Sequence, residues 1–153
     1  MLNNQHQQKE VIMKKGMGVL AVLLFGVLNM ALFSGNFNYV KAEEFKQWLE
    51  SGQEMVLVDI QVKDEFSAHH FKDSIETNAF PVETAEQRKM IDQAVTAAKA
   101  AGTDVVVICP RGGGGAKRCY SYLKEQGIAE EKLFILEGGV DKWPHKEMLL
   151  SGE

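Results

Sequence analysis

The sequence contains little cysteine, and its two cysteines cannot build the sites that cysteines most often build. The 153-residue chain has only Cys109 and Cys119. Two cysteines do not form the disulfide framework that holds small secreted domains together. They also lack the paired spacing of a zinc site, and no clustered histidines supply the missing ligands. We therefore expect no metal site and no cofactor, and consider each thiol by itself.

The sequence also lacks a basic patch. Its 17 lysines and arginines are outnumbered by 21 aspartates and glutamates, which gives a net charge of −4. Nucleic-acid-binding domains carry clustered positive charge, so a nucleic-acid partner is excluded. The apolar and charged fractions, 45% and 25%, are ordinary for a globular protein, and the length suits a single domain.

One long apolar run precedes the rest of the chain. It covers residues 16–33 and follows a polar, basic region at residues 1–15. Eighteen helical residues at about 1.5 Å each span roughly 27 Å, close to the thickness of a bilayer core. Lysines before the run, and none after it until Lys41, place the N-terminus on the cytoplasmic side. We therefore expect a hydrophobic helix in the membrane and a domain exported to the periplasmic side.

Two interpretations of the run stay open, a signal peptide that is removed and an uncleaved signal anchor. No small-x-small cleavage site follows residue 33 closely, and Val40-Lys-Ala42 would cut into the domain. This slightly favours the anchor; a buried core helix is disfavoured because no amphipathic stripe is visible. The domain is then membrane-anchored, or released after cleavage. We assign a linker to residues 34–38, the domain to residues 39–150 and a tail to residues 151–153.

Short apolar runs and amphipathic segments alternate along the domain. We predict strands at residues 39–40, 55–60, 105–108 and 133–136, helices at residues 42–50, 63–69, 84–102 and 116–126, and an extended pair at Phe80-Pro81. Thr84 and Gln87 have the spacing of a capping box at the start of the third helix. The alternation predicts an α/β fold with a central parallel β-sheet flanked by helices.

The strongest functional signal is Cys109, which ends the strand at residues 105–108. A glycine run at residues 112–115 and a predicted helix follow it. The backbone N–H groups of such a turn, and the positive end of a helix, both stabilise a thiolate. We therefore interpret Cys109 as a nucleophile. The alternative, a small buried residue at a strand end, leaves the glycine run unexplained.

These landmarks, in this order, resemble a single rhodanese domain over about residues 39–150. The matching pieces are the small helix at 42–50, the strand end Asp59-Ile60-Gln61, the element Glu65-Phe66-Ser-Ala-His69-His70-Phe71, the loop Cys109-Pro-Arg-Gly112-Gly113-Gly114 and the turn Gly138-Gly139-Val-Asp-Lys-Trp143. The resemblance implies an α/β sandwich around a parallel sheet. It also implies a sulfurtransferase whose Cys109 persulfide moves sulfane sulfur from thiosulfate or a similar donor to cyanide or a thiol acceptor.

The chain departs from the family pattern at three positions. Gln61 replaces an arginine, His69 replaces a glycine, and Gly114 stands where many active members have a loop arginine that helps to bind an anionic donor. We hypothesise that Arg111 takes over this role and binds the sulfonate end of the donor. The alternative is a solvated loop charge. Lys117 and Arg118 follow in the first helical turn; one of them facing the site entrance is an alternative, but ordinary surface positions are favoured.

The remaining site candidates surround the cysteine. The loop glycines Gly112, Gly113, Gly114 and Gly115 are predicted to turn their N–H groups toward the donor. Asp59 ends a strand at the edge where α/β sites form, so it either lines the site or caps a turn. We expect Cys119, His70 and Trp143 to be structural.

Three functions remain open at this point. The first is the sulfurtransferase described above. The second is a non-enzymatic rhodanese-like sulfur carrier or binding module that works with a redox or sulfur-relay protein partner, which the missing loop arginine favours. The third is a phosphatase or arsenate reductase, whose Cys-x5-Arg loop needs an arginine where this chain has Gly115.

Overall fold

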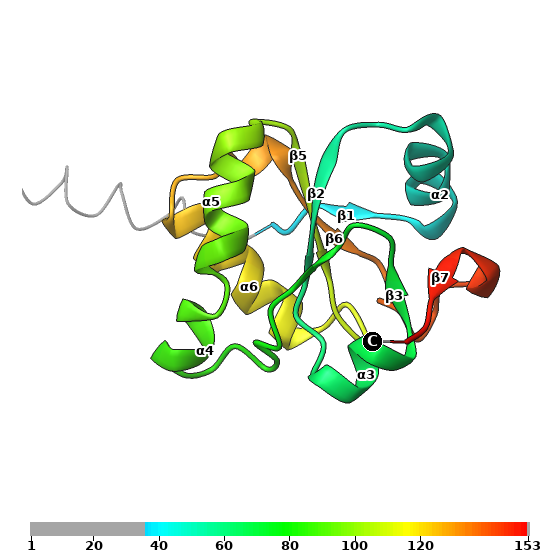
Figure 1. Cartoon of the computed structure of the whole chain (residues 1–153). Coiled ribbons are helices and arrows are strands. Elements are labelled where there is room, and N and C mark those ends of the chain that lie inside the picture. Colours follow the sequence, from blue (N-terminus) through cyan, green and yellow to red (C-terminus); the bar gives the residue numbers. More distant parts are fainter. Residues whose placement is uncertain (1–35, 153) are drawn as a thin grey trace, which may run out of the picture. The chain divides into compact units, whose positions relative to one another are not determined.

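A computed structural model describes residues 36–152 of the chain, in which strands and helices alternate (Figure 1). The elements are β1 (Tyr39–Val40), α2 (Ala42–Ser51), β2 (Met55–Asp59), α3 (Lys63–Ala68), β3 (His70–Phe71), β4 (Ile75–Glu76), α4 (Ala85–Lys89), α5 (Asp92–Ala101), β5 (Asp104–Ile108), α6 (Gly114–Glu125), β6 (Leu133–Leu136), β7 (Leu149–Leu150) and 3-10 helices at Glu130–Lys132 and Lys146–Met148. The predicted N-terminal region and hydrophobic segment, residues 1–15 and 16–33, lie outside the described residues. Within the described part, no helix combines the length and apolarity needed to span a bilayer.

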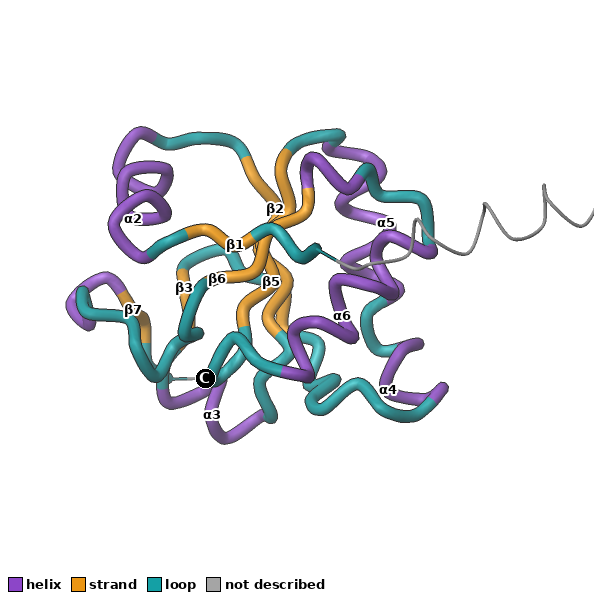
Figure 2. The backbone as a smooth tube through the Cα atoms, turned by 180° about the vertical axis from the view of Figure 1, so that it is seen from behind, coloured by secondary structure: helices purple, strands orange, loops and turns teal. Residues whose placement is uncertain are grey.

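A five-stranded sheet organises the domain. Its order is β1-β6-β5-β2-β4, and every pair is parallel. Helix α2 lies on one side of it, and α5 and α6 lie on the other (Figure 2). Strands β3 and β7 form a separate antiparallel pair. The predicted α/β fold with a central parallel sheet and flanking helices is confirmed.

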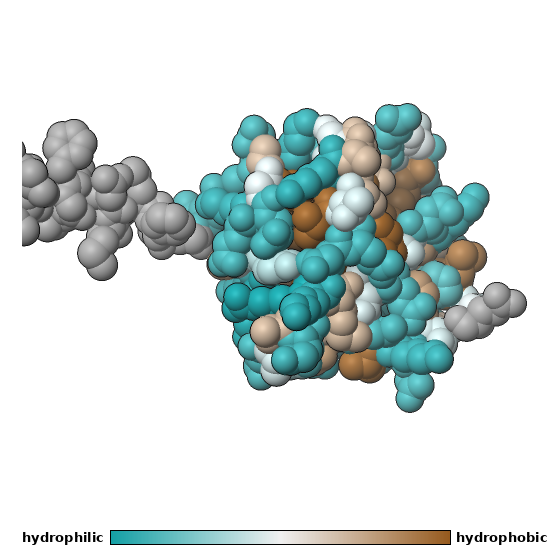
Figure 3. Space-filling view, turned by 60° about the vertical axis from the view of Figure 1, so that its left-hand side comes forward, coloured by the Kyte–Doolittle hydropathy of each residue, from teal (hydrophilic) through white to brown (hydrophobic). Residues whose placement is uncertain are grey.

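The central strand β5 is buried on both faces. Val105 and Val107 pack into the cluster beneath α5 and α6, whereas Val106 and Ile108 pack into the cluster around α2 and Trp143. Because side chains alternate across a strand, only a continuous apolar run can fill both clusters. The face of the domain shown in Figure 3 is mainly hydrophilic, with small apolar patches.

The predicted helix at 84–102 is wrong in one respect, because it forms two helices. The capping box is present: the Gln87 N–H donates to the Thr84 hydroxyl, and the Thr84 N–H donates to the Gln87 side chain. At the break, the N–H of Ile91 donates to the Arg88 carbonyl only three residues earlier. This tighter turn redirects the chain so that α5 packs Ala94 into the core.

Two further local predictions differ from the structure. Phe80 and Pro81 form a turn instead of an extended segment, closed by the Val82 N–H donating to the Ala79 carbonyl at 2.8 Å. The last long helix starts at Gly114, before the predicted 116, because the Lys117 N–H already bonds to the Gly113 carbonyl. The strands β3, β4 and β7 were not predicted, since two residues each are too few to show a period.

The compact unit begins at Phe37, inside the segment predicted as a linker. The Phe37 ring packs edge-on against Tyr120 at 5.2 Å between centroids. The side-chain amide of Asn38 donates to the Glu130 carbonyl at 2.9 Å. These residues therefore belong to the described domain.

A glycine turn after β6 holds the loop after β5 by backbone contacts. The Cys109 and Pro110 carbonyls accept hydrogen bonds from the N–H groups of Val140 and Asp141, at 3.0 and 2.9 Å. A Cβ on Gly139 would overlap the Cys109 carbonyl oxygen and lie 2.5 Å from that of Pro110. A Cβ on Gly112 would lie 2.9 Å from the Leu136 carbonyl oxygen. The two backbones approach this closely because both positions lack side chains.

We predict that Gly139→Ala destabilises the domain by more than about 3 kcal/mol, because the new methyl group meets backbone atoms that cannot move aside. Gly102→Ala is the matched control: Gly102 has nearly the same φ, +64° against +61°, but nothing within 4 Å of its Cβ position. It should cost only about 1 kcal/mol, the left-handed backbone penalty. Urea unfolding measures both, and equal losses would contradict the packing argument.

Candidate functional site

The site candidates converge at the carboxyl edge of the sheet. Cys109 follows β5, and Asp59 ends the neighbouring strand β2, where it pairs in register with Ile108. The Phe80 N–H donates to the Ile60 carbonyl at 2.8 Å, which brings the turn at residues 80–81 to the same edge. Carboxyl ends of adjacent parallel strands meet at one edge, as the sequence predicted.

The Cys109 sulfur lies inside the loop that follows it. The residue is only 2% exposed, and its Sγ accepts the Gly112 N–H at 2.9 Å. A φ of +66° at Gly112 turns this N–H inward. The backbone N–H groups of Arg111 and Gly113 also act on the sulfur, since both lower the pKa of the thiol. The predicted ring of backbone donors is therefore present.

Burial and the loop donors act in opposite directions on this thiol. Burial raises the pKa of Cys109 above its ordinary value, and the N–H groups of Gly112, Arg111 and Gly113 oppose that rise, while the charge on Asp59 adds to it. The net direction is upward, so burial outweighs the stabilisation of the thiolate that the loop donors provide. The loop donors still stabilise the charge that forms when the sulfur reacts.

The four predicted loop glycines have different surroundings. Gly112 and Gly113 direct N–H groups to the sulfur, whereas Gly114 is exposed at the start of α6. Gly115 is buried in the first helical turn, and a Cβ there would lie 2.9 Å from the Phe80 ring. The loop is therefore open at Gly113 and Gly114 and closed at Gly115.

The two arginines near the loop lie in different settings. Arg111, the predicted cation, has a side chain 67% exposed, and its Nη1 lies 3.9 Å from Asp141 Oδ2. Arg118 donates from Nε to the Pro81 carbonyl at 2.9 Å and pairs through Nη2 with Glu83 at 3.2 Å. Sequence reasoning considered Arg118 at the site entrance but favoured an ordinary surface position, because its relation to Gly114 depends on the helix starting there.

Asp59 caps a turn in the core. It is fully buried, its Oδ1 accepts the Gln61 N–H at 2.9 Å, and its Oδ2 accepts from Gln61 Nε2 at 3.1 Å. The same amide nitrogen also donates to the His69 carbonyl. Because Gln61 brings no positive charge, burial raises the pKa of Asp59 to about 7. This carboxyl organises the edge and affects Cys109 through its charge.

The other residues expected to be structural are buried or packed. Cys119 is 0% exposed, and burial raises its pKa far above the ordinary value. His70 stacks on Phe66, and Trp143 donates its indole N–H to the His145 carbonyl at 2.7 Å. Residues 36–152 contain no group of histidines, cysteines and carboxylates that could hold a metal.

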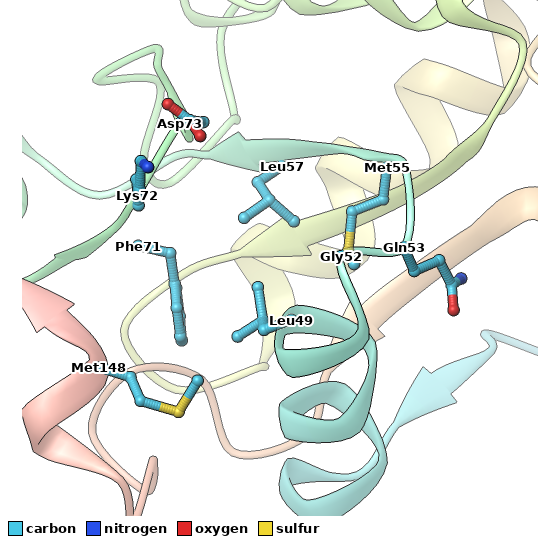
Figure 4. Close-up of a pocket in the computed structure, with 9 residues that line it drawn as sticks. All are labelled: Leu49, Gly52, Gln53, Met55, Leu57, Phe71, Lys72, Asp73 and Met148. Atoms are coloured by element: carbon cyan, nitrogen blue, oxygen red, sulfur yellow. The ribbon is translucent and has the colours of Figure 1, made fainter.

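One pocket lies away from this edge. It has a volume of about 480 Å³ and opens beside Met55, at the start of β2, between α2 and the loop after β3 (Figure 4). Leu49, Phe71 and Met148 line it, with Lys72 at its rim. It includes none of the predicted site residues.

We predict that Asp59→Asn weakens the pH dependence of stability. The folded pKa of about 7 exceeds the ordinary value of 3.8, so the neutral carboxyl stabilises the fold below pH 4, and that contribution is lost as pH rises through 7. The wild-type free energy of unfolding should fall by about 2–4 kcal/mol more than the variant's between pH 4 and pH 8. Urea titrations at both pH values measure this difference, and parallel pH profiles would contradict it.

The domain resembles solved structures in its fold. A yeast protein tyrosine phosphatase of the rhodanese family, Ygr203w, superposes with a TM-score of 0.58 at 17% identity, covering 78% of this chain and 95% of its own. The As-Sb reductase from Leishmania major gives 0.58 at 17% identity, covering 76% and 86%. A thiosulfate sulfurtransferase from Pseudomonas aeruginosa gives 0.54 at 17%, covering 77% of this chain and 20% of its own. At these identities the likeness shows the fold alone.

Sequence comparison identifies the family. No curated protein sequence matches this chain. The model of the rhodanese-like domain, however, matches residues 41–146, which is most of the domain and includes Asp59, Cys109 and the turn at Gly138 and Gly139. The chain therefore belongs to the rhodanese-like domain family.

Proposed function

We propose that this protein is a sulfurtransferase that carries sulfane sulfur as a persulfide on Cys109. The observation that carries the proposal is the position of the Cys109 sulfur, which is buried and faces the N–H groups of Arg111, Gly112 and Gly113. Such a ring stabilises negative charge on a sulfur without a metal or a charged side chain. The exposed Gly113 and Gly114 leave one side of the loop accessible to a small donor.

The first step loads the cysteine. The Cys109 thiolate attacks the outer sulfur of thiosulfate, a new S–S bond forms, and the old S–S bond breaks. Sulfite leaves with the electron pair of the broken bond, and Cys109 carries a persulfide. The loop N–H groups stabilise the negative charge on the attacking thiolate and then on the terminal persulfide sulfur.

The second step unloads it. A thiophilic acceptor, cyanide or a thiolate, attacks the terminal sulfur and leaves as thiocyanate or as a new persulfide. The electron pair of the broken S–S bond returns to Cys109, so the thiolate is regenerated and no external oxidant is needed. The same loop donors stabilise it as the leaving group.

Phosphoryl or arsenate chemistry has less support, despite the likeness in fold to the yeast tyrosine phosphatase and the Leishmania reductase. A Cys-x5-Arg loop holds an oxyanion with an arginine six residues after the cysteine. This chain has Gly115 there, and the Phe80 ring lies where a side chain at that position would begin. An arginine would therefore have to displace Phe80 to enter the loop.

We predict that thiosulfate adds one sulfur, about 32 Da, to the protein, and that cyanide removes it. Intact-protein mass spectrometry measures the addition. Cys109→Ser should abolish it, and Cys119→Ser is the matched control that should retain it, because Cys119 is buried in the core.

The outcomes of this experiment separate the competing functions. Loading in Cys109→Ser, or no loading from any sulfane donor, would overturn the proposal. Loading of one sulfur per chain with negligible turnover on small acceptors would instead favour a sulfur carrier that works with a redox or sulfur-relay protein partner.

We also propose, on sequence grounds, that the domain acts outside the cytoplasm, on the periplasmic side. The apolar run at residues 16–33 and the lysines before it support export. We predict that the native protein recovered from membranes keeps its N-terminus, as expected for an anchor. Mass spectrometry of the mature protein measures this. Recovery of an intact chain from the cytosolic fraction would contradict export, and a truncated periplasmic form would identify a signal peptide.

A further inference from the structure

The position at which the family carries its loop arginine is filled here by an arginine from the next helical turn. A Cβ on Gly114 would lie 3.2 Å from Nη1 of Arg118, 3.6 Å from Nη2 and 3.7 Å from Cζ. The two residues are four apart in α6, so they lie above one another on the same helix face. The Arg118 guanidinium therefore lies beside Gly114, in space that a side chain at this position would reach.

Two contacts fix this guanidinium. Its Nε donates to the Pro81 carbonyl at 2.9 Å, and its Nη2 lies 3.2 Å from Glu83 Oε1. Both partners belong to the turn at residues 80–83 and its flank, which reaches the carboxyl edge through Phe80. Within residues 36–152, Nη1 donates no hydrogen bond, and it is the guanidinium nitrogen closest to Gly114. The N–H groups of Arg118 Nη1 are therefore available to a ligand beside the loop that surrounds Cys109.

The other cations near the loop point elsewhere. Lys117 is exposed, and its Nζ lies 5.6 Å from the centre of the Phe37 ring. Arg111 is mostly solvated and loosely paired with Asp141, on the side of the glycine turn. Among these three, only Arg118 is both anchored by a backbone carbonyl and in contact with the loop.

We propose that Arg118 is the specificity-determining residue that binds the anionic end of the sulfur donor, in place of the loop arginine that Gly114 lacks. This inference rests on the proposed sulfur transfer and assigns to Arg118 the role that the sequence alone suggests for Arg111. A guanidinium presents paired N–H donors that match the oxygens of a sulfonate. The donor class it selects is a sulfane sulfur compound with an oxyanion end, such as thiosulfate.

Glu83 moderates this selection. Its carboxylate pairs with the same guanidinium and competes with an incoming anion for it. Removing its charge in Glu83→Gln should strengthen donor binding, whereas removing the Arg118 charge should weaken it. The two substitutions therefore act in opposite directions on one property, which a purely structural role of either residue does not produce.

The test uses two alkylating reagents of the same shape, iodoacetate, which is anionic, and iodoacetamide, which is neutral. We expect both to react at Cys109, whose loop is exposed at Gly113 and Gly114, and not at Cys119 on the core face of α6. In Arg118→Gln we expect the ratio of the iodoacetate rate to the iodoacetamide rate to fall about tenfold, the loss of one charge-assisted hydrogen bond. Glu83→Gln should raise the ratio. Neither measurement requires sulfur transfer, so the result is independent of the proposed function.

The matched control is Lys117→Gln, which removes the same charge one residue earlier on a side chain that faces Phe37. Lys117→Gln should leave the ratio of the iodoacetate rate to the iodoacetamide rate unchanged. Arg118→Lys should retain most of the wild-type ratio. Thiosulfate loading provides the second readout: Arg118→Gln should raise the thiosulfate concentration for half-maximal loading about tenfold at an unchanged iodoacetamide rate.

An unchanged ratio in Arg118→Gln, or an equal fall in Lys117→Gln, would overturn the assignment even if the protein transfers sulfur. A fall in the ratio only in Arg111→Gln would return the role to Arg111. Conversely, a selective effect of Arg118 on alkylation without any sulfur loading would uphold the anion site and overturn the sulfurtransferase.

Discussion

The site depends on the contact between two glycine-containing backbones. The loop after β5 can surround the Cys109 sulfur only because its carbonyls are held by the turn after β6. Gly112 and Gly139 make that approach possible, since a side chain at either position would meet main-chain atoms. Neighbouring strands of one parallel sheet bring the two segments together, so the fold itself supplies the geometry.

Two electrostatic features meet at the carboxyl edge of the sheet. One is the set of backbone N–H dipoles at Cys109, and the other is the buried carboxyl of Asp59, which has no positive partner among residues 36–152. Backbone N–H groups favour charge on Cys109, whereas its own burial and the charge of Asp59 disfavour it. Gln61 satisfies both Asp59 oxygens with hydrogen bonds but adds no positive charge. The cation of this edge comes from Arg118 on the outer side of the loop. In such a site the loop donors stabilise the negative charge that forms on the sulfur when it reacts, against the opposing effects of burial and of Asp59.

Much of this arrangement was predictable from the sequence. The apolar composition of residues 55–60, 105–108 and 133–136 predicts strands that are buried on both faces of the sheet. The glycines that follow Cys109 indicated that backbone N–H groups surround its sulfur. Helix boundaries were less predictable, because the break at Ile91 and the early start at Gly114 depend on packing. The role of Arg118 could not be read from spacing, since it follows from the absence of a side chain one turn earlier.

The burial of Cys119 has a quantitative consequence. The chain has only two cysteines, and the second is buried on the inner face of α6, so no other accessible thiol of this chain can take over a sulfur held by Cys109. Under the proposed sulfur transfer, a loaded molecule has no second thiol to which it can pass the sulfur. The flux of sulfur would then scale with the number of chains and with how often each meets an acceptor.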